Sequence, residues 1–158
     1  MFEYSLRYKI SGKIEYLKAM ESSPEEVYQN LLCPTNDEIY MDLGAYDGDT
    51  IREFLHFTDG AYQEIIALEP DPRNFKKLLA RTQGVTCIQA GAWSEDCTMR
   101  FSARGGRNSA LSGKGTETVM RAVDSVLCGA AATYLKFDVE GCLLYTSIWL
   151  VAVKGGKA

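Results

Sequence analysis

Two glycines and a carboxylate follow one apolar segment of the chain at a spacing that suits ligand binding. The stretch 42–48, Asp-Leu-Gly-Ala-Tyr-Asp-Gly, comes directly after an apolar run and directly before a helical pattern. Glycine lets a backbone turn sharply and approach a ligand closely, and the first turn of a helix offers free N–H groups. A plain strand-to-helix turn can require the same glycines, so this motif alone leaves both interpretations open.

A second carboxylate, Glu69, ends the next apolar segment. It lies roughly 20 residues after the glycine turn, where a carboxylate that accepts hydrogen bonds from a ribose diol is expected. A solvated charge at a strand end is the alternative, but the two features together favour a nucleoside. The glycines follow G-x-x-x-G and not the G-x-G-x-x-G of a pyrophosphate site, and Asp42 before them suits an ammonium group. The residues therefore predict a nucleoside ligand without a pyrophosphate.

Alternating strands and helices must position these residues. Buried strands are predicted at 38–43, 64–69, 85–90 and 133–139, and helices at 51–57 and 73–83. The alternation predicts an α/β fold with a parallel sheet and right-handed crossovers. Further along, the sequence predicts an added strand at 98–102, a mobile loop at 104–117, and either a strand or a short helix at 119–127.

Local signals mark several helix ends. Ser23 and Pro24 indicate a helix start within a helical preface at 1–36. Asp49 and Thr50 are expected to cap the helix at 51–57, while Asp71 opens the one at 73–83. The apolar face of this second helix is expected to carry Phe75, Leu78 and Leu79, and Gly84 to end it.

Composition limits the function classes. The chain has 158 residues, 46% of them apolar, which suits one domain with one core. A net charge of -4 argues against nucleic acid as the main partner. No run of ~18 apolar residues and no secretory signal is present, so we expect no membrane span and a cytoplasmic protein. Five cysteines without a C-x-x-C pair and a single histidine, His56, predict free thiols and no metal site.

Four segments resemble the motifs of FkbM-type S-adenosylmethionine-dependent methyltransferases, in the order of that family. They are 40–51 (YMDLGAYDGDTI), 67–72 (ALEPDP) with Phe75, 90–94 (AGAWS) and 135–141 (LKFDVEG). The resemblance implies a Rossmann-like methyltransferase fold with a mostly parallel sheet at 37–141. It also implies methyl transfer from S-adenosyl-L-methionine, typically to an oxygen of a sugar or natural product.

The resemblance implies roles at the matching positions. The methionine part of the cofactor is assigned to the first turn, the ribose to Glu69 with Pro70 beside it, and the adenine to the third turn. The residues so assigned are Asp42, Gly44, Ala45, Tyr46 and Gly48 in the first turn and Ala90, Gly91 and Ala92 in the third.

The fourth motif is expected to face the methyl acceptor. Asp138 is placed toward the methyl group or the substrate and is the candidate base. Lys136 and Glu140 flank it, either with a direct role or as strand-end charges that pair with each other. His56 is expected to be an ordinary helix residue. The loop at 104–109 could cover the acceptor or be a solvated loop.

The segment 142–158 departs from the family. It begins with CLLYTS, which one reading frame of a common sequencing-library transposon end encodes, so we expect a non-native tail in place of the remaining strands. A genuine divergent terminus is the alternative, and 148–153 could still act as a strand. The sheet is then truncated after its fourth core strand, with one edge exposed, and we expect weak or absent catalysis.

Three functions stay open at this point. The first is an enzyme that methylates a small-molecule or glycan hydroxyl. The second is a non-catalytic module that binds the nucleoside or S-adenosylmethionine, and the third is a nicotinamide-dependent oxidoreductase, which the glycine order disfavours. The identity of the acceptor, the atom methylated and the oligomeric state do not follow from the sequence.

Overall fold

The computed structural model describes residues 2–19, 22–102, 110–111, 116–138 and 151–152. The chain divides into two units, Met1–Pro34 and Thr35–Ala158. Of the expected non-family tail at 142–158, only Val151–Ala152 lies within the described residues. The loop at 104–109 and Glu140 lie outside them.

The first unit is helical. It contains α1 (Phe2–Ser11), α2 (Glu15–Lys18), α3 (Pro24–Glu26) and a π-helical turn (Val27–Leu32). The predicted helix start is confirmed, because the Ser23 hydroxyl accepts from the N–H of Glu26 while the Glu26 carboxylate accepts from the N–H of Ser23. This reciprocal capping box satisfies two N–H groups that the helix cannot bond itself.

The second unit is built on a five-stranded sheet. Its strand order is β3 (Thr86–Ile88), β2 (Glu64–Leu68), β1 (Ile39–Leu43), β8 (Tyr134–Phe137) and β9 (Val151–Ala152). The first four are parallel, which confirms the predicted sheet, and β9 runs antiparallel to β8. β8 is thus the fourth core strand, as predicted, and the two-residue strand β9 comes from the segment 148–153, which could still act as a strand.

A second, four-stranded sheet follows the third core strand. Its order is β4 (Gly91–Trp93), β7 (Thr116–Ala122), β5 (Cys97–Ser102) and β6 (Ala110–Leu111). The added strand predicted at 98–102 is confirmed. The segment left open at 119–127 contains both candidates, the end of β7 and the helix α6 (Val123–Leu127). The described residues of the expected loop at 104–117 belong to β6 and β7.

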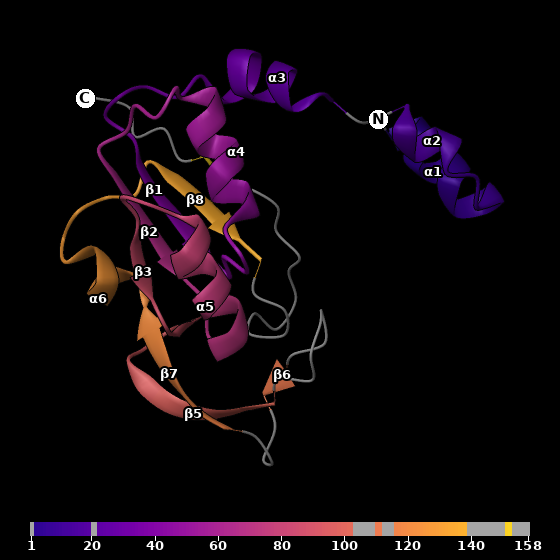
Figure 1. Cartoon of the computed structure of the whole chain (residues 1–158). Coiled ribbons are helices and arrows are strands. Elements are labelled where there is room, and N and C mark those ends of the chain that lie inside the picture. Colours follow the sequence, from indigo (N-terminus) through magenta and orange to yellow (C-terminus); the bar gives the residue numbers. More distant parts are fainter. Residues whose placement is uncertain (1, 20–21, 103–109, 112–115, 139–150, 153–158) are drawn as a thin grey trace. The chain divides into compact units, whose positions relative to one another are not determined.

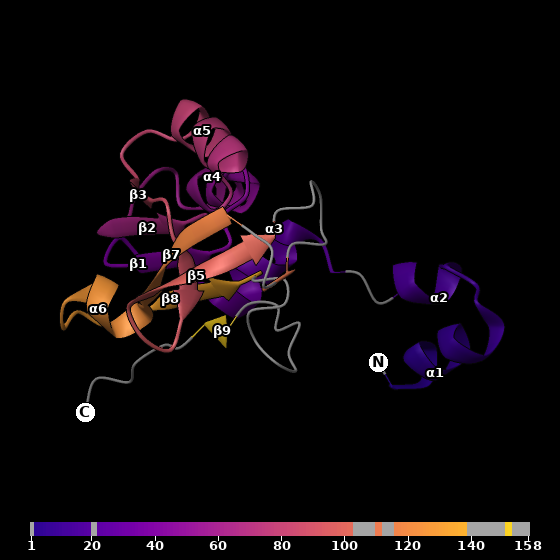
Figure 2. The ribbon, with the colours of Figure 1, turned by 90° about the horizontal axis from the view of Figure 1, so that it is seen from below.

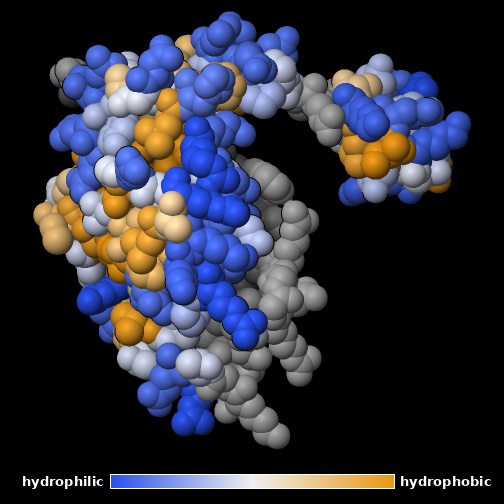
Figure 3. All heavy atoms as spheres, viewed as in Figure 1, coloured by the Kyte–Doolittle hydropathy of each residue, from blue (hydrophilic) through white to orange (hydrophobic). Residues whose placement is uncertain are grey.

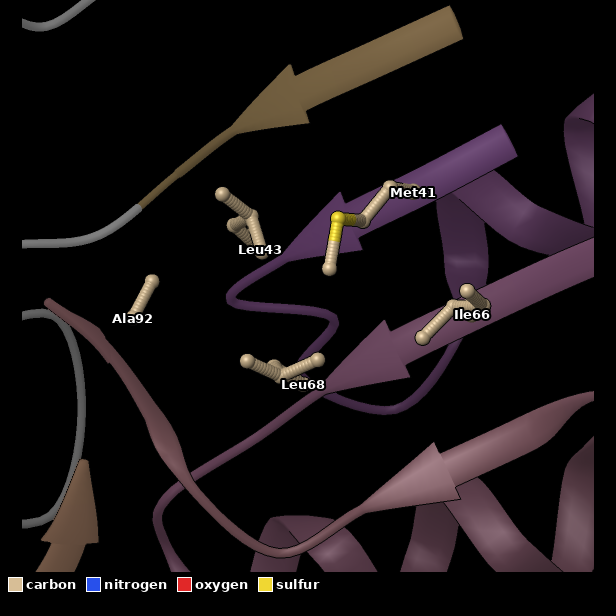
Figure 4. Packing of buried hydrophobic residues seen from close by; sticks show 5 residues of the cluster. All are labelled: Met41, Leu43, Ile66, Leu68 and Ala92. Atoms are coloured by element: carbon tan, nitrogen blue, oxygen red, sulfur yellow. The ribbon is translucent and has the colours of Figure 1, made fainter. Parts of the chain in front are cut away.

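Helices cover both faces of the five-stranded sheet. The helices α4 (Asp49–Phe57) and α5 (Pro72–Arg81) lie over one face and α6 over the other (Figures 1 and 2). Because strand side chains alternate between faces, Met41 and Leu43 point to the α6 side. They form one apolar cluster with Ile66, Leu68 and Ala92 (Figure 4).

The opposite face packs on α4 through aromatic rings. The ring of Phe54 lies 4.7 Å from that of Tyr40 on β1 and 5.6 Å from that of Tyr134 on β8, measured between centroids. Hydrophilic residues cover the outward side of α4 and α5, the blue band in Figure 3. The prediction for the apolar face of α5 is confirmed for Leu78, which is fully buried. It is wrong for Leu79, which is 54% exposed. None of the described helices is long and apolar enough to cross a membrane.

The two helix starts differ in how they are capped. The carboxylate of Asp71 caps α5 as predicted, accepting from the N–H groups of Arg73 and Asn74. The predicted cap of α4 by Asp49 and Thr50 is wrong, because both residues lie inside the helix and Gly48 is its N-cap. Gly48 has φ +80°, and a Cβ there would lie 2.7 Å from Cγ2 of Thr82 and 3.0 Å from Cδ1 of Leu78. The absence of a side chain at Gly48 therefore allows the start of α4 to pack closely against the end of α5.

We expect Gly48→Ala to lower the free energy of unfolding by about 2–4 kcal/mol, because it combines a left-handed backbone with overpacking. Gly60→Ala is the matched control. Gly60 has φ +72° but open space around its Cβ position, so only the backbone cost of ~1–2 kcal/mol applies. Urea unfolding of both variants measures the difference. Equal losses would contradict the packing argument.

Candidate functional site

The carboxyl ends of three neighbouring strands bring the predicted residues together. Since β2, β1 and β8 are adjacent and parallel, their ends lie along one edge of the sheet. The N–H groups of Gly44 and Ala45 both donate to the carbonyl of Leu68 at 2.9 Å, and the N–H of Asp138 donates to the carbonyl of Leu43 at 2.9 Å. The segments that leave the three strands are thus tied to one another by backbone hydrogen bonds.

Glu69 follows the last residue of β2 at this edge. Its Oε2 accepts from the N–H of Tyr46 at 2.8 Å, and its Oε1 accepts from the N–H of Asp71 at 2.9 Å. The residue is only 6% exposed, and this burial raises the pKa of its carboxyl above the ordinary value, while the two backbone hydrogen bonds oppose the rise. The carboxylate therefore fixes the glycine turn to the second strand.

The glycine turn is held in a defined shape. Gly44 adopts φ +86° and Tyr46 φ +50°, and the N–H of Gly48 donates to the carbonyl of Ala45 at 2.8 Å. Asp47 forms ion pairs with Arg81 at the end of α5 and with Arg52 on α4. Left-handed backbone at a non-glycine residue is uncommon and clusters at functional sites.

Tyr46 is the exposed member of the turn. Its side chain is 49% exposed, and Nζ of Lys77 lies 5.4 Å from the centre of its ring. A flat ring at the rim of the strand ends can cover a ligand that lies beside Glu69, since its own N–H is bonded to that carboxylate.

Asp42 is fully buried, with both of its carboxylate oxygens engaged. Nζ of Lys136 donates to Oδ1 at 2.9 Å, while the hydroxyls of Thr50 and Tyr40 donate to Oδ2 at 2.6 and 3.2 Å. Lys136 also donates to the carbonyl of Gly44 at 3.2 Å. The lysine thus pairs with Asp42 across two strands, a partner that the sequence did not indicate.

The turn at 90–92, assigned to the adenine, lies beside Pro70, which follows Glu69. Ala90, Gly91 and Ala92 are all buried, and a Cβ on Gly91 would lie 3.8 Å from Cβ of Pro70. The same Cβ would also meet the flexible end of Met120 at 2.7 Å. The residues that the resemblance assigned to ribose and adenine are therefore neighbours, as one ligand would require.

The remaining candidates lie around this edge or away from it. Asp138 is exposed at the end of β8. His56 is exposed in the last turn of α4, at the opposite end of that helix from the glycine turn. A crevice of about 290 Å3 lies on the α6 side, lined by Ile88, Arg121, Ser125 and Val126.

Sequence reasoning missed the part that two residues, Thr50 and Tyr40, play in the site, and it missed the pairing of Lys136 with Asp42. Tyr40 and Thr50 stand two residues before and eight residues after Asp42. Tyr40 had no predicted role of its own, and Thr50 had been predicted only as a helix cap. Lys136 is 94 residues away in sequence, and only the strand register that sets Asp42 opposite Lys136 brings them together.

Comparison with solved structures reveals one informative similarity. The crystal structure of methyltransferase FkbM from Methylobacillus flagellatus KT matches this chain with a TM-score of 0.64 and 21% sequence identity. The chain has the fold of that methyltransferase. The match covers 87% of this chain and 36% of the methyltransferase, so the chain spans about a third of its length. No family model and no curated protein matches the sequence.

The predicted Rossmann-like methyltransferase fold is thereby confirmed. The described residues supply the α/β arrangement expected of that fold, with the strand order β3-β2-β1-β8 and helices on both faces of the sheet. At 21% identity the likeness concerns the fold. The cofactor and the activity follow from it only as proposals.

We expect the raised pKa of Glu69 to appear as a pH dependence of stability. Folding favours the protonated form, so this contribution is present below the ordinary value of 4.5 and is lost as the pH rises through the higher folded pKa. Glu69→Gln cannot titrate. The free energy of unfolding of the unmodified chain should therefore fall relative to that of Glu69→Gln as the pH rises, measured by urea unfolding.

Glu64→Gln, at the exposed start of the same strand, controls for the change in net charge. A stability difference between the unmodified chain and Glu69→Gln that stays constant with pH, or that moves in the opposite direction, would contradict the raised pKa.

Proposed function

We propose that this chain binds S-adenosylmethionine at the carboxyl ends of β1 and β2 and belongs to a methyltransferase that acts on a hydroxyl of a sugar or natural product. The observation that carries the proposal is the geometry of Glu69. A buried carboxylate lies directly beside a glycine turn, at the edge of the sheet where this fold class binds nucleosides.

The residues present fit such a cofactor. An ionised carboxylate has about four acceptor sites, and backbone N–H groups use two of those on Glu69, which leaves capacity for the two hydroxyls of a ribose. Pro70 and Gly91 lie side by side where the adenine would follow the ribose. The small size of Ala90 and Ala92 is in keeping with a flat ring packed nearby.

Charge supports a positively charged ligand. Of the three carboxylates at the ends of the three strands, Asp42 is paired with the ammonium of Lys136. Among the residues that the structure describes, neither Glu69 nor Asp138 forms an ion pair, although the ammonium of Lys77 lies near the ring of Tyr46. S-adenosylmethionine supplies a methyl group activated by a positive sulfur. Excess negative charge at the strand ends attracts such a ligand and disfavours dinucleotides, whose phosphates are anionic.

Asp138 is the proposed base for the acceptor. It is exposed at the end of β8, and its backbone is fixed by the hydrogen bond to Leu43. An exposed carboxylate at this edge can hold the proton that a hydroxyl releases as its oxygen is methylated. The acceptor is proposed to be a small molecule or a glycan that approaches from this side.

We expect the chain to bind S-adenosylhomocysteine and not NAD in calorimetric titration. Glu69→Gln should weaken S-adenosylhomocysteine binding by about 10–100-fold, because it removes charged acceptors from the ribose hydroxyls. Glu64→Gln, on the same strand but at its other end, should change the affinity little. Binding of NAD instead would favour an oxidoreductase, and binding of neither by the folded chain would contradict the proposed site.

Methyl transfer is tested separately with labelled S-adenosylmethionine and a panel of sugar and natural-product hydroxyls. Because the chain spans about a third of the length of the methyltransferase that it resembles, we expect only weak transfer of label to the acceptor by the unmodified chain, and at least a tenfold smaller rate with Asp138→Asn. Cofactor binding without transfer to any acceptor would favour the non-catalytic binding module.

A further inference from the structure

The ammonium of Lys136 lies where the ligand's ammonium was expected. It donates to Oδ1 of Asp42 at 2.9 Å and to the carbonyl of Gly44 at 3.2 Å. These two groups, the carboxylate at the end of the first strand and the carbonyl at the first glycine, are the acceptors that the glycine turn would offer to an amino-acid ligand. The lysine side chain is 12% exposed and that of Asp42 is 0% exposed.

The far side of the Asp42 carboxylate is also closed. Thr50 donates to its Oδ2 at 2.6 Å and Tyr40 at 3.2 Å. A ligand ammonium could reach this carboxylate only by displacing a donor. Displacing Lys136 would leave a largely buried ammonium without its partner, which is unfavourable.

We propose that Lys136 is a positioning residue of the cofactor site. Its ammonium holds the carboxylate of Asp42 and the carbonyl of Gly44 in one arrangement, and so keeps the glycine turn in the shape that receives the methionine part of the cofactor. Asp42 then acts through Lys136 and not by direct contact with the ligand. This inference rests on the proposed function, because it specifies how that same site recognises the amino-acid end.

The backbone of the turn explains why such an anchor is needed. Tyr46 has φ +50°, a left-handed conformation that a non-glycine residue keeps only when surrounding contacts enforce it. Gly44, with φ +86°, adopts such backbone without strain, but its conformational freedom means that contacts must select one arrangement. Glu69 enforces the turn from β2 through the N–H of Tyr46. Lys136 enforces it from β8 through the carbonyl of Gly44. Glu69 and Lys136 thus hold the turn from two strands. Glu69 also binds the ribose in this proposal, whereas Lys136 shapes the part of the turn that receives the amino-acid end.

The test compares two ligands that differ only at the amino-acid end. S-adenosylhomocysteine carries it, and 5′-methylthioadenosine lacks it. We expect Lys136→Met to weaken S-adenosylhomocysteine binding about tenfold or more and methylthioadenosine binding less than about threefold. Lys76→Met removes an exposed lysine of α5 to which no role in the site is assigned and is the matched control, with both affinities close to those of the unmodified chain.

A second variant removes the risk that a buried unpaired carboxylate prevents folding. Asp42→Asn combined with Lys136→Met eliminates both charges at similar size. We expect it to keep the selective loss, because the carbonyl of Gly44 still lacks its donor. Equal loss of both ligands, or full recovery of S-adenosylhomocysteine binding in the double variant, would show that the lysine only neutralises a buried charge. Tighter binding in Lys136→Met would show that the lysine occupies the ligand's place.

Hydrogen exchange separates this inference from the proposed function. If the unmodified chain binds neither ligand, the proposed function fails, and the positioning claim is judged on the free protein. We expect faster amide exchange at 45–48 in the double variant, with exchange at 65–68 on β2 unchanged. Unchanged exchange at 45–48 would overturn the positioning role.

Discussion

The second unit depends on one buried ion pair, between Asp42 on β1 and Lys136 on β8. Asp42 has no exposed surface, and Lys136 is the cation that pairs with it among the described residues. A carboxylate with no exposed surface is costly unless it is compensated, and here Lys136 supplies a charged partner while Thr50 and Tyr40 supply further donors. The pair therefore requires that β1 and β8 be neighbours in parallel register, and it brings together the strand ends at which the proposed ligand binds.

The two ends of these strands are closed by different chemistry. At the amino end, the buried carboxylate of Glu38 accepts from the N–H and hydroxyl of Thr35 and from the hydroxyl of Thr133. These donors are neutral, and they fasten the start of β1 to the start of β8. At the carboxyl end the donors include a charged lysine and the backbone of a left-handed turn. The end that combines charge with uncommon backbone is where function is expected.

The sequence predicted the central strands because parallel strands buried on both faces form continuous apolar runs, as in 39–43 and 64–68. It predicted the start of α5 because Asp71-Pro72 is a local signal. The cap of α4 was predicted wrongly, because Gly48 is required by packing on Thr82, a contact between residues 34 positions apart. Glu69 could be identified from its spacing. The partner of Asp42 could not, because strand register and not local pattern sets it opposite Lys136.

The proposed ligand is a nucleoside with an amino-acid end that binds where β1, β2 and β8 end. The most direct measurement is a titration of the isotopically labelled chain with S-adenosylhomocysteine, followed by amide chemical shifts in NMR. We expect the largest shifts at 44–48, 69–71 and 90–92, with little change at Glu38 and Thr133 at the opposite end of the strands. Shifts confined to the crevice of Ile88, Arg121, Ser125 and Val126, or none at saturating ligand, would contradict the proposed site.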